Sequence, residues 1–414
     1  QFSSPTKRYR TGIIMRVLQV APSLSVQLGG PTEVIVSLSK EYKKLGIISE
    51  IATTTHLVEL NSNYEVGDLI NYNEVDVRFF SAHLTYKEYV VSLDFTRWLW
   101  KNIRNYDLIE IHYLFTYTSS ISAWFARLFK IPYIVHTMGQ LDKWCLKQSY
   151  LKKAVYGTLV EKANLNNAAF IHCTAAPEAQ DVRDFGAIAP ILVSPLGVNP
   201  PAPIEDARFI VQEKYGIPKD RSILLFLSRI HPKKQPNLLI EAVAALENYR
   251  DVHVVFAGSG ETEYESELKR QVQNLGLGDH VSFAGFVTGP AKSELLFAAD
   301  IFVLPSYSEN FGLAIADALA HGVSVITTRG VQIHEDIVKY KAGLVIDNNV
   351  DQLISAIETL LGDRKLRQSF SKNAKHLVQE RYQWSALALS LKTEFENALC
   401  LSDNRSQCPS ISNK

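Results

Sequence analysis

DIFVLPSYSENFGLAIADALAHGVSVITT, the stretch from Asp300 to Thr328, predicts the fold of this chain. A short apolar run is broken by Pro305 and a polar loop, and an apolar segment then runs from Leu313 to His321. Gly322 follows as a helix-ending glycine would, and a β-branched run comes next. Strand, loop, buried helix and buried strand in this order are typical of a parallel sheet covered on both faces.

Two carboxylates interrupt this apolar unit, Glu309 at the tip of the loop and Asp317 inside the helix. A buried carboxylate is costly unless it is hydrogen-bonded, so each is expected to have a partner. Both lie beyond the carboxyl ends of the expected strands, where open α/β sheets bind ligands. The amides of Phe311, Gly312 and Leu313 would begin the helix with free N–H groups, which suit a phosphate. Carboxylates for hydroxyls beside amides for phosphate suggest a sugar nucleotide.

Length and composition set broad limits on the protein. The 414 residues suggest two or three domains, and a hydrophobic fraction of 46% with 21% charged residues describes a globular protein. Because 43 basic residues balance 43 acidic ones, no overall charge points to nucleic acid as a partner. The four cysteines lack close metal-ligand spacing, which favours reduced thiols and a cytoplasmic protein.

The ends of the chain differ from its body. No transmembrane helix is expected, because the most apolar region, residues 111–135, contains charged residues and a proline. The segment MRVLQVAPS from Met15 resembles a natural start, so residues 1–14 are interpreted as a disordered extension. Residues 401–414 are polar and are expected to be a disordered tail.

Strand and helix patterns alternate along both halves, which predicts an α/β fold with two doubly wound, Rossmann-like parallel-sheet domains facing a central cleft. A proline-rich stretch after Asn199 predicts the linker. The expected domains are residues 15–198, an acceptor domain, and residues 199–383, a nucleotide-sugar domain, with a last helix at 384–399. Strands are expected at residues 16–20, 47–54, 75–80, 107–112, 133–136, 170–173, 191–194, 223–228, 252–257, 281–284, 301–304, 323–327 and 343–345.

Two cations follow the first strand of the second half, Arg229 at the strand end and Lys234 before the next helix. Cations fixed at this edge could neutralise a departing nucleotide diphosphate, so no metal is required. An ordinary solvated basic loop is the alternative. The position favours a functional role for Arg229 and Lys234 and gives Lys233 little weight.

Glycines follow three of the expected strands. Gly29 and Gly30 come after the first strand and precede Pro31, where backbone could approach a phosphate. Gly258 and Phe286 follow the second and third strands of the second half and could frame a nucleotide base through backbone groups. Ordinary structural turns explain these glycines equally well.

Two histidines end neighbouring strands of the first half. His112 ends the strand at 107–112 and His136 ends the strand at 133–136. From strand ends across the cleft, His136 could touch the transferred sugar and His112 the acceptor. A structural role is the commoner fate of a single histidine.

These motifs together resemble the retaining glycosyltransferases of the GT4 family, which have the GT-B fold. The strongest match is Ser308-Glu309-Asn310-Phe311-Gly312-Leu313 followed by Ala320-His321-Gly322, which is similar to the family's pattern of two acids with seven residues between them. The resemblance implies that Glu309 holds sugar hydroxyls and that Asp317, a shorter acid than the usual glutamate, holds the nucleotide ribose.

The resemblance extends to other parts of the site. Arg229 and Lys234 match the family's pyrophosphate pair, although Gln235 stands where a glycine is usual, and Gly30 matches the donor-phosphate glycine. His136 is similar to the family's histidine near the reacting sugar. The final helix at 384–399 would cross back onto the first domain. The implied reaction moves a hexose-type sugar from an NDP-sugar to an acceptor hydroxyl with retention, without metal or cofactor, in polysaccharide or glycolipid synthesis.

The acceptor domain has an unusual belt of aromatic and basic residues. Residues 87–104 and 142–153 mix tryptophan and tyrosine with lysine and arginine. This composition suits an anionic membrane surface bearing a lipid-linked acceptor, and it equally suits amphipathic helices packed on their own sheet. A nucleotide-sugar epimerase, a non-catalytic sugar-nucleotide-binding protein and an NAD-dependent dehydrogenase are rival interpretations. The dehydrogenase would need a glycine fingerprint that this sequence lacks.

Overall fold

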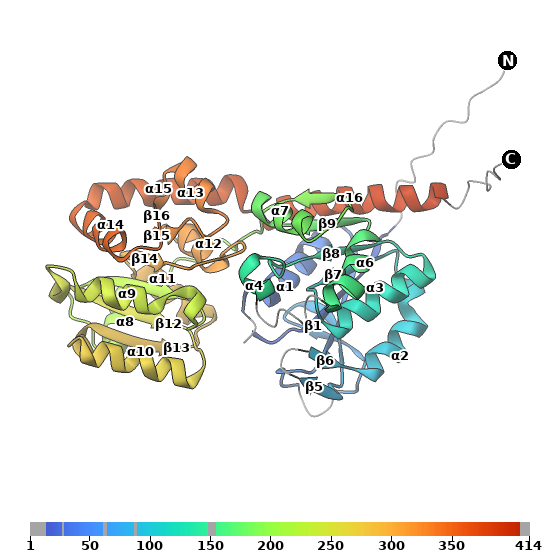
Figure 1. Cartoon of the computed structure of the whole chain (residues 1–414), viewed down its shortest axis with the longest axis horizontal. Helices are drawn as coiled ribbons and strands as arrows, with labels where there is room; N and C mark the ends of the chain where they lie inside the picture. Colours follow the sequence, from blue (N-terminus) through green and yellow to red (C-terminus); the bar gives the residue numbers. More distant parts are fainter. Residues whose placement is uncertain (1–13, 27–28, 61–63, 87–88, 148–154, 406–414) are drawn as a thin grey trace, which may run out of the picture.

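Two separate parallel sheets form the framework of the chain (Figure 1). The computed structural model describes residues 14–26, 29–60, 64–86, 89–147 and 155–405. Each sheet has helices on both faces, so the expected pair of α/β units is confirmed. The proposed extension at 1–14 falls almost wholly outside the described residues, and so do parts of the aromatic belt.

The first sheet has eight strands in the order β10-β9-β8-β7-β1-β2-β4-β3, of which all but β3 pair in parallel. Its strands are β1 (Arg16–Ser23), β2 (Ile48–Thr54), β3 (Leu69–Tyr72), β4 (Val75–Phe80), β7 (Leu108–His112), β8 (Tyr133–His136), β9 (Phe170–Cys173) and β10 (Ile191–Val193). A small hairpin of β5 (Leu84–Tyr86) and β6 (Tyr89–Val91) lies beside it.

The second sheet has six strands, all parallel, in the order β13-β12-β11-β14-β15-β16. These are β11 (Ser222–Leu227), β12 (Val252–Ala257), β13 (Val281–Gly285), β14 (Ile301–Leu304), β15 (Ser324–Thr328) and β16 (Gly343–Ile346). Residues of β11, β12, β14 and β15 are almost all fully buried, as the continuous apolar runs predicted.

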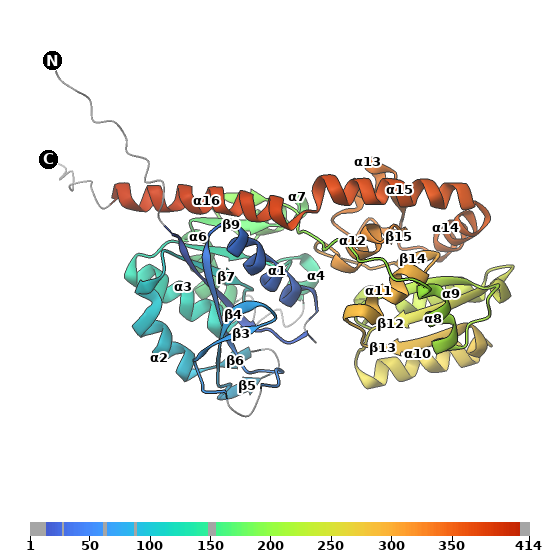
Figure 2. The same ribbon diagram turned by 180° about the vertical axis from the view of Figure 1, so that it is seen from behind.

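Helices cover both sheets (Figures 1 and 2). The first domain carries α1 (Gly30–Lys44), α2 (Leu93–Asn102), η2 (Ile103–Asn105), α3 (Tyr117–Phe129), α4 (Lys143–Lys147), the π-helical turn η3 (Gly157–Glu161), α6 (Lys162–Asn166) and α7 (Ala176–Asp184). The remainder carries α8 (Ala207–Tyr215), η4 (Pro232–Lys234), α9 (Pro236–Ala244), η5 (Tyr249–Asp251), α10 (Thr262–Asn274), η6 (Gly278–His280), α11 (Gly289–Ala298), α12 (Leu313–Ala320), α13 (His334–Tyr340), α14 (Val350–Gly362), α15 (Arg364–Arg381) and α16 (Trp384–Arg405).

The strand order of each sheet explains where a ligand site can form. In the second sheet the chain passes from β11 outward to β12 and β13, then returns to β14 on the other side of β11. The loops that follow β11 and β14 therefore diverge at a topological switch point, where open α/β sheets bind ligands. In the first sheet β1 and β7 make the equivalent switch.

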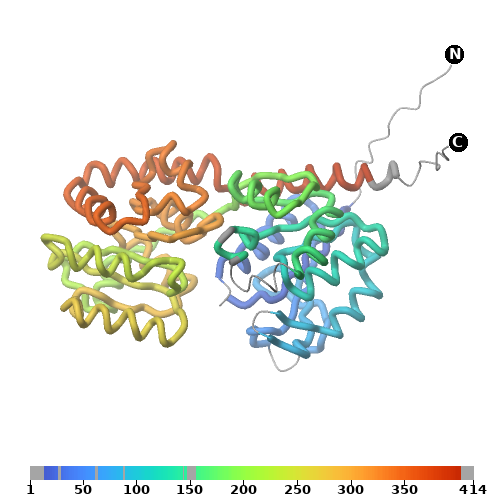
Figure 3. Tube along the Cα trace, viewed as in Figure 1, coloured from blue at the N-terminus to red at the C-terminus, as the bar shows by residue number. Residues whose placement is uncertain are grey.

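The chain crosses between the domains at two adjacent places. The Val198 amide donates to the Tyr382 carbonyl at 3.0 Å, and a Cβ placed on Gly197 would overlap the Trp384 backbone. Helix α16 then lies along the first domain, as the trace shows (Figure 3). Phe395 contacts Tyr42 and Phe170 there, and Lys392 donates to a main-chain carbonyl at the end of α1.

Two features differ from the sequence-based expectation. The edge strands β3, β5 and β6 were missed, because β3 and β5 are largely exposed and have no apolar run. Helix α16 continues to Arg405, so residues 401–405 are not part of a disordered tail, and 406–414 lie outside the described residues. Among the described helices, none is long and apolar enough to span a membrane.

Candidate active site

Lys234 and Glu309 form an ion pair at the switch point of the second sheet. Lys234 ends η4 after β11, and Glu309 lies in the loop after β14, so two distant segments bring the charges together. The side chains are only 10% and 15% exposed, and burial lowers the pKa of Lys234 although Glu309 opposes that shift. Ser306 also donates to Glu309, at 3.3 Å. Both residues were expected at this edge of the sheet, and the structure pairs them there, whereas their roles stay predictions.

Arg229 adds a second cation beside this pair. Its side chain is exposed, and its charge helps to lower the pKa of Lys234 and of His231, after the effect of burial in each case. Arg229, Lys233 and Lys234 thus lie along one loop, and two carboxylates face them, Asp142 at Lys233 and Glu309 at Lys234, which leaves an excess of one positive charge. An anionic ligand with two phosphates would balance this excess of positive charge.

The glycine loop of the first domain faces the start of α12. A Cβ placed on Gly30 would lie 2.6 Å from the Leu313 Cδ1 atom, so the first turn of α1 and the first turn of α12 touch. The Phe311 side chain turns inward and packs against Tyr382, with ring centroids 5.1 Å apart. The Phe311 side chain is thus buried away from a ligand, and anion binding by the amides of Phe311, Gly312 and Leu313 stays a prediction.

Asp317 has a partner that the sequence did not indicate. Lys292 of α11 donates to its carboxylate at 2.9 Å and lies 3.6 Å from Glu33 of α1, in the first domain. Burial raises the pKa of Asp317, with Lys292 opposing, and burial and then Asp317 raise the pKa of Glu33. The acid predicted to hold ribose hydroxyls is therefore occupied by an ammonium group in this structure.

Gly258 and Phe286 flank the outer side of the second sheet. Gly258 has a φ of 148°, and a Cβ there would collide with the Ser228 carbonyl oxygen. The glycine is thus required for the close approach of the loops after β11 and β12. Phe286 is 46% exposed. Gly258 follows β12 and Phe286 follows β13, and their contact with a nucleotide base stays a prediction.

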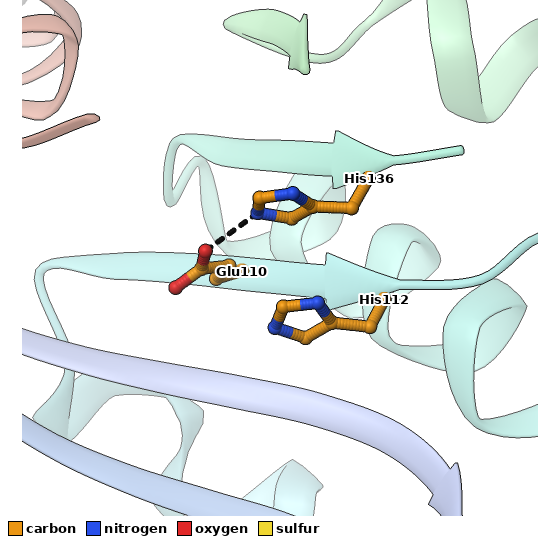
Figure 4. Close-up of side chains that lie close together, drawn as sticks. All are labelled: Glu110, His112 and His136. Atoms are coloured by element: carbon orange, nitrogen blue, oxygen red, sulfur yellow. Dashed lines mark hydrogen bonds and ion pairs between the residues drawn. The ribbon is translucent and has the colours of Figure 1, made fainter. Parts of the chain in front are cut away.

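The predicted histidines point into the first domain. His112 and His136 are 0% and 1% exposed, and Figure 4 shows both rings on adjacent strands beside Glu110. His136 shares hydrogen bonds with Glu110 at 2.5 Å and with His172 at 2.8 Å, while His112 bonds Gln19 at 3.0 Å. Both rings are buried in the first domain in this structure. Their position at strand ends suggested contact with a ligand across the cleft, but that position does not determine whether a side chain is exposed.

Burial governs the protonation of this cluster. It raises the pKa of Glu110 to about 8 and lowers that of His136 to about 3, and His172 is lowered to about 3 by burial and by His136. The shared proton therefore stays on Glu110, and His136 is neutral. Tyr42 donates a further hydrogen bond to Glu110 at 2.9 Å.

Glu110, His112 and His136 place possible metal-ligating atoms within 4.8 Å of one another (Figure 4). The two imidazole rings are stacked, however, with an interplanar angle of 13° and centroids 4.5 Å apart. A metal ion lies in the plane of each ring that binds it, and two stacked parallel planes share no such point. The geometry therefore fits a hydrogen-bonded core cluster and does not fit a metal site.

The sequence analysis did not identify the residues that form ionic contacts between the two domains. Lys233, given little weight, lies 3.0 Å from Asp142 of the first domain, and Glu33 and Lys292 make the second ionic contact described above. No local sequence signal marks them, because each depends on a partner more than 80 residues away. Their discovery requires the tertiary structure.

The fold and these loops define the class of protein. Two parallel α/β units whose carboxyl-end loops meet around a Lys–Glu pair and a helix start are the architecture of GT-B glycosyltransferases. Solved structures agree in fold: Anabaena HepE in complex with UDP and glucose has a TM-score of 0.75 at 18% identity over 92% of this chain and all of that one. Sucrose-phosphate synthase from Thermosynechococcus elongatus has a TM-score of 0.75 at 19% identity, over 94% of this chain and all of its own.

Sequence comparison gives the family. Residues 29–197 match the family described as Glycosyl transferase 4-like domain, and residues 208–377 match Glycosyl transferases group 1. D-inositol 3-phosphate glycosyltransferase 2 of Catenulispora acidiphila is 30% identical over 313 residues, 71% of each chain. The corresponding enzyme of Corynebacterium glutamicum is 28% identical over 326 residues, 74% of this chain and 75% of its own. This chain belongs to the GT4-type group 1 glycosyltransferases, and it is an enzyme of that class.

Proposed function

We propose that this glycosyltransferase moves a hexose-type sugar from an NDP-sugar to an acceptor hydroxyl with retention of anomeric configuration. One observation carries the proposal: Lys234 and Glu309 pair at the switch point beside Arg229 and the first amides of α12. Cations and amides there suit a diphosphate, and a carboxylate suits sugar hydroxyls.

Arg229 and Lys234 would stabilise the charge that develops on the leaving diphosphate. The bond between the anomeric carbon and the phosphate oxygen breaks, and the acceptor oxygen attacks that carbon on the same face. The acceptor proton passes to the departing phosphate, so no protein base is needed. Glu309 leaves its ion pair as the phosphates arrive and binds sugar hydroxyls, because Lys234 gains a stronger anionic partner.

The same residues support an enzyme that needs no metal or cofactor. Two fixed cations and helix amides would provide the electrostatic stabilisation that a divalent ion provides elsewhere. Donor turnover that survives chelation with EDTA is the expected result, and turnover that returns only on adding Mg²⁺ or Mn²⁺ contradicts the proposal.

The names of the relatives support a sugar nucleotide and a phosphorylated or lipid-linked acceptor. Two are D-inositol 3-phosphate glycosyltransferases, and a Mycolicibacterium smegmatis relative, 29% identical over 211 residues, is a GDP-mannose-dependent phosphatidylinositol monomannoside mannosyltransferase. For this chain we propose a glycan or lipid-linked acceptor in polysaccharide or glycolipid synthesis, and a cytoplasmic location.

The test is a donor screen by thermal shift with UDP-glucose, GDP-mannose and ADP-glucose, comparing the wild type with Arg229→Ala. A ligand that binds only the folded state raises the melting temperature. Stabilisation by one donor that is lost in the variant supports the proposal. Binding without any turnover would favour a non-catalytic protein, and sugar isomerisation without an acceptor would favour an epimerase.

We further propose contact with an anionic membrane through one face of the first domain, formed by α2, α3 and η3. Within the predicted belt, Phe95 is fully buried and Trp98 packs under Arg78, whereas Trp100 is 50% exposed. Trp124 of α3, which lies outside the predicted belt, is also 50% exposed. A surface hollow of about 350 Å³ between α3 and η3 is lined by apolar and aromatic side chains, Trp124 among them. The exposed basic residues on this face are Arg97, Lys101, Arg104 and Lys130.

Exposed indole rings next to cations are suited to the interface of an anionic bilayer. Sedimentation with vesicles of phosphatidylglycerol and phosphatidylcholine at low salt tests this. Binding by the wild type that is lost in Trp100→Ser/Trp124→Ser supports the contact. Equal binding by both proteins, or none by either, excludes it.

A further inference from the structure

Asp142 lies where the two domains touch. It follows β8 in the first domain and directly precedes α4, and its side chain is 11% exposed. One carboxylate oxygen, Oδ1, accepts a hydrogen bond from the Cys145 amide at 2.6 Å. The first turn of α4 therefore holds this carboxylate in a fixed direction, as a helix N-cap does.

The other oxygen reaches the second domain. Asp142 Oδ2 accepts from Lys233 Nζ at 3.0 Å and from Ser308 Oγ at 3.3 Å. Burial raises the pKa of Asp142, but the Cys145 amide and Lys233 outweigh it and hold the pKa below its usual range. The carboxylate is therefore charged at neutral pH and makes charge-assisted bonds to two loops at once.

Those two loops carry the proposed active-site pair. Lys233 directly precedes Lys234, and Ser308 directly precedes Glu309. The loops are also joined within the second domain, because the Tyr307 amide donates to the Lys233 carbonyl at 2.8 Å.

The first domain approaches this junction closely. A Cβ placed on Gly139 would lie 2.6 Å from the Asn310 Cβ atom. Lys233 Nζ lies 4.7 Å from the centre of the Trp144 ring, and that ring packs edge-on against His231 at 5.6 Å. The Trp144 ring thus covers the Lys233 ammonium group. An ion pair that is shielded from water is stronger than an exposed one, so the contact strengthens the Asp142–Lys233 pair.

We propose that Asp142 is a positioning residue, which fixes the loops of Lys234 and Glu309 when the domains are closed. The proposal rests on the proposed function of that pair. The carboxylate touches neither residue of the pair, so it acts through their neighbours Lys233 and Ser308. Because a shift of about 1 Å in a catalytic group can cost roughly 100-fold in rate, an anchor one residue away from each is sufficient to matter.

The first test measures hydrogen–deuterium exchange of the ligand-free protein in Asp142→Ala and in the wild type. The Tyr307 amide, bonded to Lys233, and the Glu309 amide, bonded to Gly330 at 3.0 Å, report on the two loops. We expect faster exchange at both in the variant. Asp363→Ala is the matched control, because Asp363 is exposed and caps α15 through the Leu366 amide at 2.9 Å. Unchanged exchange at both loops in Asp142→Ala overturns the proposal.

The second test separates rate from affinity, with the sugar nucleotide that stabilises the wild type in the donor screen. We expect Asp142→Asn to lower kcat for release of the nucleoside diphosphate by about 10- to 100-fold. The Kd of the nucleoside diphosphate should not change, since Arg229 and the α12 amides remain. Adding Lys233→Met to Asp142→Asn should cost little more, because both changes break the same ion pair.

Three outcomes are distinguishable. If the wild type binds and turns over no sugar nucleotide, the proposed function fails, while the exchange experiment still decides whether Asp142 orders the loops. If kcat is unchanged in Asp142→Asn, the positioning role is wrong. If only the KM of an acceptor rises, Asp142 binds the acceptor directly, which also contradicts positioning.

Discussion

Lys292 donates to the Asp317 carboxylate at 2.9 Å, so the acid predicted to bind a ribose is neutralised by a lysine from the preceding helix. The same ammonium group lies 3.6 Å from Glu33 of the other domain. Burial alone would lower the pKa of Lys292, but Asp317 and Glu33 outweigh it and raise it. One cation therefore connects the donor side of the site to the first domain.

Replacing Lys292 by methionine should destabilise the protein. The change leaves Asp317 buried without its cation, and a buried unsatisfied polar group costs about 1 to 3 kcal/mol. Because burial already raises the pKa of Asp317, the loss should be smaller at pH 5, where the carboxyl can bind a proton, than at pH 8. Urea denaturation at the two pH values measures it. The double variant Lys292→Met/Asp317→Asn should recover part of the stability, and no recovery would mean that the charge of Asp317 is not the cause.

Glu110 should make the stability of the protein fall as the pH rises. Its pKa is raised from 4.5 to about 8 in the folded chain, so the folded state holds a proton that the unfolded state releases. The contribution is complete below about pH 4.5 and is lost up to about pH 8, at a slope near 1.4 kcal/mol per pH unit for one proton. Chemical denaturation at several pH values between about 6.5 and 8 should show this decline, reduced in Glu110→Gln.

His136 and His172 act in the opposite direction. Their pKa values are lowered to about 3, so stability is lost as the pH falls below about 6.5 and the unfolded chain takes up protons. Below about pH 6.5 the two histidines outweigh the single carboxyl of Glu110, and above it Glu110 acts alone, so the wild type should be most stable near pH 6.5. A Glu110→Gln curve with the same alkaline slope as the wild type would contradict the assignment of the proton to Glu110.

Gly258→Ala should be strongly destabilising. At a φ of 148° an alanine is strained, and its Cβ would collide with the Ser228 carbonyl oxygen, which is backbone and cannot turn away. We expect a loss of at least about 2 kcal/mol in the free energy of unfolding. Gly362→Ala is the matched control, because nothing lies within 4 Å of a Cβ at that helix end. Equal melting temperatures for the two variants would refute the close approach of the loops.

Phe395→Ala should loosen the last helix from the first domain. The ring is fully buried between Tyr42, at 5.7 Å, and Phe170, at 6.3 Å. Removing a buried phenylalanine side chain costs about 3 to 5 kcal/mol. Limited proteolysis should cut α16 faster in this variant, whereas Leu389→Ala, on the exposed side of the same helix, should behave like the wild type. Protection that is equal in both variants would mean that α16 docks by other contacts.

Much of the fold could be predicted because short hydrophobic runs and turn residues in the sequence indicate where strands begin and end. The strands β11, β12, β14 and β15 are short runs rich in leucine, β-branched and aromatic residues and bounded by turn residues, and the structure has them within one residue of the predicted ends. The strand β3 could not be found in this way, since its exposed alternation, LINY, differs little from a loop. Pairing with β4 makes it a strand, and that partner supplies the hydrogen bonds that a single sequence does not reveal.

In the candidate site, too, some features could be predicted from the sequence and others depend on tertiary packing. Lys234 and Glu309 were each expected at the carboxyl edge of the second sheet, and they lie close together there because the loops that carry them follow the adjacent strands β11 and β14. His136 also lies at the carboxyl end of a strand, as predicted, but its ring turns inward and bonds Glu110. The direction of a side chain at a strand end depends on the residues packed around it, which the sequence does not show.

By itself the sequence determined the two α/β domains, the family and the loops that carry the site, since hydrophobic period, turn residues and motif spacing are local properties. Only the tertiary structure decided which charges are paired across the domains: Asp142 with Lys233, and Glu33 with Lys292. Ion pairs form between side chains that folding brings within a few ångströms, and burial then sets their strength and pKa values. Neither the distance nor the burial is encoded in any short stretch of chain.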